Sequence, residues 1–89
     1  MTDTEKTVKI NEMVETYCTR WNGHMKEALK NAMKAIVYVN TDVPEAADAE
    51  SYQAYTVVQG IISFMENSYF LDAYQTVKLS DFAADLYYC

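Results

Sequence analysis

The sequence contains few of the residues that form turns, since only two glycines and one proline occur among its 89 residues. β-Sandwiches and β-barrels need many turns, so this scarcity argues against an all-β fold. Hydrophobic residues make up 51% of the chain and aromatic residues 13%, far from the composition of a disordered chain. We therefore expect residues 1–89 to form a single all-α domain, close to the size at which one core is marginal.

Membrane and disulfide signals are missing as well. No apolar run approaches the ~20 residues that span a membrane, and the first residues, MTDTEKTVKI, lack the apolar stretch of a signal peptide. The two cysteines, Cys18 and Cys89, have no metal-like spacing and are too few for a disulfide framework. These absences favour a cytoplasmic protein with free thiols and no contact with a membrane.

Negative charge is concentrated in the second half of the chain. Residues 1–41 carry six Lys/Arg against five Asp/Glu, whereas residues 42–89 carry eight Asp/Glu and only Lys78. Binding to nucleic-acid phosphates requires clustered cations, so we expect no direct contact with a nucleic-acid backbone. An acidic half is compatible with docking on a basic protein. The alternative is that the acidity only keeps a small protein in solution.

Apolar residues recur at helical spacing through both halves. At 100° per residue, the first set falls within about 40° of one line: Ile10, Val14, Cys18, Trp21, Met25, Ala28, Ala32, Ile36 and Val39. Because this phase does not slip at Asn22-Gly23, it predicts one helix over about residues 4–39, and a kink at 22–23 would preserve the same phase. A loop is expected at residues 40–43, a second helix over about 44–77 and a short helix over about 81–88.

Two long helices in an antiparallel hairpin bury only one seam each and leave other apolar residues uncovered. Pairing of such hairpins into helical bundles would bury those residues. We therefore expect a homo-oligomer, either a dimer or a higher assembly. The alternative is a monomer in which the chain breaks at Asn22-Gly23 and folds over into a compact three- or four-helix bundle.

Motifs that carry chemistry are absent. The sequence contains no Ser-His-Asp set, P-loop, GxGxxG or CxxC pattern, and His24 is its only histidine. We therefore expect no enzyme activity, no catalytic residue, no cofactor and no metal site. A candidate basic edge for phosphate or an acidic partner is formed by lysines at i, i+4 and i+8, namely Lys26, Lys30 and Lys34, although an ordinary solvated helix face would have the same pattern.

Six of the eight tyrosines lie in the acidic half, interleaved with carboxylates. Tyrosine is enriched at protein interfaces, so this combination suits a basic partner, including one that itself binds nucleic acid. The candidate partner-binding residues are Asp48, Glu50, Tyr52, Glu66, Asp72, Tyr74, Asp81 and Asp85. The alternative places these rings in the core or at a subunit interface, with the carboxylates on the wet side.

These features favour a non-enzymatic binding protein that docks on and occludes a basic partner protein. Small size, acidity and missing catalytic motifs have the general character of phage-encoded inhibitors of host or defence factors, although no motif carries that likeness. One alternative is an oligomer that sequesters a nucleotide in pockets of Trp21, tyrosine and lysine between subunits. Another is a structural adaptor that joins other helices through its apolar faces.

Overall fold

The computed structural model describes residues 2–88 and consists of helices. The helices are α1 (Asp3–Tyr17), α2 (Gly23–Val37), α3 (Pro44–Asn67) and α4 (Ala73–Tyr88). No strand occurs between residues 2 and 88. The prediction of an all-α fold is therefore confirmed, whereas the predicted number and lengths of the helices need correction.

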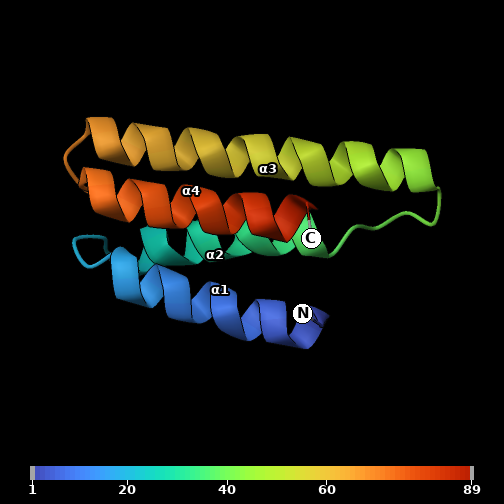
Figure 1. Ribbon diagram of the computed structural model, residues 1–89, viewed down its shortest axis with the longest axis horizontal. Coiled ribbons are helices and arrows are strands. Elements are labelled where there is room, and N and C mark those ends of the chain that lie inside the picture. Colours follow the sequence, from blue (N-terminus) through green and yellow to red (C-terminus); the bar gives the residue numbers. More distant parts are fainter. Residues whose placement is uncertain (1, 89) are drawn as a thin grey trace.

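The helices run alternately up and down along a bundle measuring 39 × 23 × 22 Å (Figure 1). Each helix packs against the next one in the sequence, and α4 also contacts both α1 and α2. In Figure 1, α1 and α3 lie at opposite edges, with α2 and α4 between them. The chain therefore forms two helical hairpins, α1–α2 and α3–α4, packed against each other.

The predicted continuous helix over residues 4–39 is wrong, because the chain reverses direction at residues 18–22. Asn22 starts α2, and its side-chain oxygen accepts a hydrogen bond from the backbone N–H of Met25 at 2.9 Å. Cys18 and Trp21 are both buried in the core, although they lie within the turn. Buried positions therefore keep a helical phase through the turn, which is why the periodicity did not reveal it.

The predicted helix over residues 44–77 is also too long, since α3 ends at Asn67 and α4 begins at Ala73 rather than near residue 81. Asp72 stands before the first residue of α4, and its carboxylate accepts a hydrogen bond from the N–H of Gln75 at 2.8 Å. The turn at residues 68–72 contains no glycine and no proline. The end of α3 therefore lacks the usual signals of a helix C-terminus, although Asp72 followed by Gln75 is a usual signal of a helix N-terminus.

The second helices of the two hairpins, α2 and α4, have similar burial patterns. Residues 21–38 and 71–88 have the same order of buried, half-buried and exposed positions, except where Ala32 corresponds to Phe82. The capping residues Asn22 and Asp72 are equivalent in this alignment. Apart from Leu29 with Leu79 and Tyr38 with Tyr88, equivalent positions hold different residue types, so the similarity lies mainly in the pattern of burial and not in the sequence.

One core of apolar side chains joins the four helices. It consists of Ile10, Val14, Cys18, Trp21, Leu29, Met33, Ile36, Val58, Ile62, Met65, Leu71, Leu79, Phe82, Ala83 and Leu86. The accessible surface is 5358 Å², close to the roughly 5300 Å² expected of a folded monomer of this mass. One chain thus forms a single core across all four helices, although large apolar side chains such as Val57 and Phe64 remain exposed on its surface. Self-association itself stays a prediction.

None of the helices between residues 2 and 88 combines the length and the apolar character needed to cross a membrane.

Candidate functional site

Four tyrosines pack together where the last turn of α4 meets the N-terminal half of α3. This tyrosine cluster consists of Tyr52, Tyr55, Tyr87 and Tyr88. The rings of Tyr55 and Tyr87 are stacked, with centroids 5.3 Å apart and planes inclined by 10°. Tyr88 packs edge-on against Tyr87 at 4.8 Å, and Tyr52 does so at 5.6 Å. The cluster is therefore an aromatic surface shared by both helices of the second hairpin.

The unequal lengths of α3 and α4 leave part of this cluster open to solvent. The N-terminal turns of α3 extend past the C-terminal end of α4 (Figure 1). Tyr55 and Tyr87 are half-buried and form the base of the cluster. Tyr52 remains 51% exposed and Tyr88 72% exposed. These two rings thus keep half or more of their surface in contact with water.

A carboxylate is attached to the cluster. The hydroxyl of Tyr87 donates a hydrogen bond to Oδ1 of Asp48 at 3.2 Å. Burial raises the pKa of the Tyr87 hydroxyl, and the bond to Asp48 raises it further, so the phenol stays protonated and remains a donor at neutral pH. Asp48 is exposed, and its other lone pairs can accept further hydrogen bonds from a partner.

The carboxylates around the cluster have no cation beside them in the sequence. No lysine, arginine or histidine occurs between Lys34 and Lys78, a stretch that includes all of α3. Among residues 2–88, the ion pairs all involve Glu15 of α1, so no carboxylate of α3 or α4 is paired with a cation there. The second hairpin therefore presents negative charge that the chain itself does not neutralise.

The structure separates the predicted partner-binding residues into groups. Asp48, Glu50 and Tyr52 lie at the end that holds the tyrosine cluster, and Glu50 and Tyr52 line one shallow depression on α3. Glu66 lies on α3 about 27 Å beyond Asp48 along the helix axis, at a rise of 1.5 Å per residue. The other predicted residues are distributed from the turn at 68–72 along α4, namely Asp72, Tyr74, Asp81 and Asp85. These eight residues therefore do not form one continuous site.

Two of these separated residues have structural roles at the other end of the bundle. Asp72 caps α4 through its bond to Gln75. Tyr74 packs against Tyr17 of α1, with ring centroids 6.1 Å apart, and the ammonium group of Lys78 lies 5.4 Å from the centre of the Tyr74 ring. Tyr74 is thus already paired with a cation from its own chain.

Three members of the cluster were not singled out from the sequence: Tyr55, Tyr87 and Tyr88. The i, i+3 spacing of Tyr52 and Tyr55 was a usable signal, since it places both rings on one side of a helix. Tyr87 and Tyr88 could be added only by knowing that the end of α4 packs on this part of α3. That contact depends on where the turn at residues 68–72 falls.

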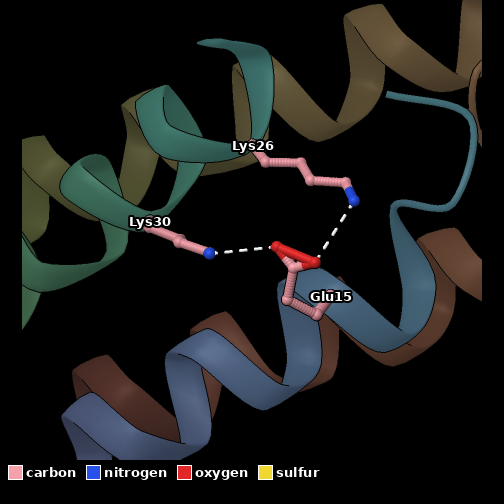
Figure 2. Close-up of polar contacts among 3 residues, drawn as sticks. All are labelled: Glu15, Lys26 and Lys30. Carbon is pink, nitrogen blue, oxygen red and sulfur yellow. Dashed lines mark hydrogen bonds and ion pairs between the residues drawn. The ribbon is translucent and has the colours of Figure 1, made fainter. Parts of the chain in front are cut away.

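The candidate basic edge is largely occupied by α1. Nζ of Lys26 lies 3.2 Å from Oε2 of Glu15, and Nζ of Lys30 lies 3.1 Å from Oε1 (Figure 2). The hydrogen bond from Lys30 lowers the pKa of the Glu15 carboxyl most, and the hydrogen bond from Lys26 lowers it further. Lys34 is half-buried one turn further along α2. Two of the three lysines therefore bridge α1 and α2 instead of forming an open cationic stripe.

The residues near the first turn serve the core. Trp21 is buried, and its Nε1 donates a hydrogen bond to the carbonyl oxygen of Phe70 at 3.2 Å. Cys18 is fully buried, and this burial raises the pKa of its thiol to about 12. His24 is exposed. Residues 2–88 contain no group of three or more His, Cys, Asp or Glu side chains placed to hold a metal ion.

No family model, curated protein or solved structure matches this chain. Its function is therefore inferred from its own surface chemistry, in which the tyrosine cluster and the unpaired carboxylates are the most distinctive features.

Proposed function

We propose that this protein is a non-enzymatic binding protein whose α3–α4 hairpin docks on a basic partner protein and occludes it. The observation that carries the proposal is the combination of exposed tyrosine rings with carboxylates that have no cation partner within residues 2–88. Each feature alone is common on protein surfaces. Together they provide both contact area and a charge that a basic surface would complement.

Charge supplies attraction at long range. The chain has a formal net charge of −6, and residues 42–89 account for it. A concentrated negative hairpin accelerates encounter with a basic protein and orients the approach, an effect that weakens as salt rises. Binding by this route is therefore expected to depend steeply on ionic strength.

Shape makes occlusion a reasonable consequence of docking. A typical stable interface buries about 800 Å² on each partner, and the bundle is 39 Å long and 23 Å wide. One hairpin face can therefore cover a functional patch on another protein without any chemical step. A small acidic inhibitor of a host or defence factor would act in this way.

Affinity capture with charge-neutral variants tests the proposal. The bait is compared with a variant carrying Glu45→Gln, Asp48→Asn and Glu50→Gln, whose amides keep hydrogen-bonding groups while removing three charges. The matched control carries Asp3→Asn, Glu12→Gln and Glu27→Gln, which remove three charges from exposed positions on α1 and α2. The proposal predicts basic partners that the first variant loses, the control retains and added salt releases. Equal capture by all three baits would contradict it.

A structural adaptor is the second candidate, and one surface favours it. A shallow groove between α2 and α3 is lined in part by the uncharged residues Ala35, Ala54 and Val57. Docking of an apolar helix there would be nearly insensitive to salt, which distinguishes it from the proposed function. The nucleotide alternative gains no such support, because Trp21 is buried and Lys26 and Lys30 are paired with Glu15.

A further inference from the structure

The tyrosine cluster also indicates which side chain of a basic partner is recognised. Resting on the proposed function, we propose that the cluster is an arginine-binding site, in which guanidinium groups stack on the exposed rings of Tyr52 and Tyr88. The adjacent carboxylates, chiefly Asp48, complete the site by pairing with the stacked cation. The partner chemistry is therefore an arginine-bearing segment of a protein.

The open rings are the first line of support. Packing within the protein explains the positions of Tyr55 and Tyr87, because their rings stack on each other and are half-buried. It does not account for Tyr52 and Tyr88, which keep about half or more of their surface in water while touching that base. Rings held by neighbours lose little entropy when a ligand stacks on them, so they form a pre-organised platform.

The carboxylates are the second line of support. Glu45, Asp48 and Tyr52 follow one another at i, i+3 and i+7 on α3, so they share one face of the helix. The hydroxyl of Tyr87 fixes Asp48 beside the rings. A cation lying on Tyr52 would therefore meet carboxylate oxygens at its edge. The chain has no lysine or arginine of its own between residues 35 and 77 to take that place.

Exposed aromatic rings next to carboxylates favour arginine over lysine as the bound side chain. A guanidinium is planar and weakly hydrated, stacks flat on an aromatic ring and still presents N–H groups in its plane to a carboxylate. An ammonium group is compact and strongly hydrated, so it gains less from lying on a ring beside a carboxylate. Purely electrostatic attraction would treat the two cations alike. A preference for arginine is therefore the signature of this site.

Two peptides of equal charge test the proposal. Acetylated peptides with four Gly-Arg repeats or four Gly-Lys repeats are titrated into the full chain by calorimetry at low salt. We expect the arginine peptide to bind roughly two- to three-fold more tightly, because lysine also makes cation–π contacts but stacks less well on a ring. The double variant Tyr52→Leu/Tyr88→Leu should lose this preference. The control Tyr74→Leu, which removes an exposed tyrosine outside the cluster, should keep it.

The outcomes separate this proposal from the proposed function. Equal affinity for the two peptides would overturn the arginine site while leaving an acidic docking surface intact. Binding of neither peptide would contradict both. An arginine preference that survives in the double variant would place the recognition elsewhere and overturn the site. Circular dichroism of each variant checks that helicity is unchanged, as expected for side chains this exposed.

Discussion

The indole Nε1 of Trp21 donates a hydrogen bond to the carbonyl oxygen of Phe70 at 3.2 Å, joining residues 49 positions apart. A second bond runs in parallel, because the Arg20 guanidinium donates to the carbonyl oxygen of Tyr69, also at 3.2 Å. The turn of each hairpin is thereby fastened to the turn of the other. These contacts hold the two hairpins in register at the end opposite the tyrosine cluster (Figure 1).

Replacement of Trp21 by phenylalanine should destabilise the bundle by about 1–2 kcal/mol. The substitution removes the indole donor and some buried volume while keeping an aromatic ring in the core. Urea unfolding should show a lower midpoint with an unchanged slope. Arg20→Gln, at an exposed position, is the control and should cost less. A Trp21→Phe variant as stable as the parent would show that the bond between the turns contributes nothing.

Tyr69 has a left-handed backbone, with φ of 66°, and its side chain is 85% exposed. Its N–H bonds to the carbonyl of Glu66, and the N–H of Phe70 bonds to that of Met65, a pattern that ends helices and usually has glycine at this position. Tyr69→Gly should therefore relieve strain and raise the midpoint of thermal unfolding by about 2–5 °C.

Thr19 provides the matched control for that substitution. It occupies the equivalent position of the first turn, where the backbone does not adopt a positive φ. Thr19→Gly should lower the unfolding midpoint, because glycine only adds freedom to the unfolded chain. If both glycine variants shift the midpoint in the same direction, the strain assigned to Tyr69 is not the cause.

Glu15 makes the stability depend on acid pH. Its two lysine partners lower the pKa of its carboxyl in the folded state, so the stabilisation is full above the unfolded value of about 4.3 and is lost as pH falls through the lower folded value. Thermal unfolding of the parent and of Glu15→Gln should therefore differ by a constant amount between pH 5 and 8. The difference should shrink progressively as pH falls below about 4.3. A gap that persists in acid would show that the carboxylate charge is not responsible.

The closed bundle makes the oligomer prediction directly testable. Since four helices from one chain share a single core, light scattering after size-exclusion should give a mass near the 10.2 kDa of one chain at micromolar concentration. A dimer mass would restore self-association as part of the account. Dilution of the variants Val57→Lys and Val8→Lys would then locate the interface. Both valines are exposed, and weaker association of Val57→Lys alone would assign the interface to the α2–α3 groove.

The sequence predicts the fold class because helical spacing and the scarcity of glycine and proline both exclude sheets. It predicts the first turn only as an alternative, through Asn22-Gly23, and does not predict the second. Cys18 and Trp21 keep the helical phase through the first turn, and Tyr69 stands where a glycine would have marked the second. Besides the local caps Asn22 and Asp72, the two turns contact each other through the bonds from Arg20 and Trp21. Local patterns cannot report such contacts.

Part of the candidate site could also be predicted from the sequence, and part of it could not. Charge and tyrosine content predict a docking surface in the acidic half, and of the residues named for it Tyr52 belongs to the tyrosine cluster, Asp48 is bonded to it and Glu50 lies near it. The sequence alone could not join Tyr87 to Tyr55, because these residues are brought together only by the reversal at residues 68–72. It also placed Asp72 with the others, although this carboxylate caps α4.

Mapping a bound basic peptide by nuclear magnetic resonance tests the central claim most directly. Titration of the four-repeat Gly-Arg peptide into the isotope-labelled protein should shift the backbone signals of α3 residues 45–55 and α4 residues 84–88, and these shifts should shrink as salt rises. Signals of α1 should stay in place. Shifts centred on α1 and α2, or the absence of any localised shift, would contradict the claim that the tyrosine–carboxylate end of the second hairpin is the docking surface.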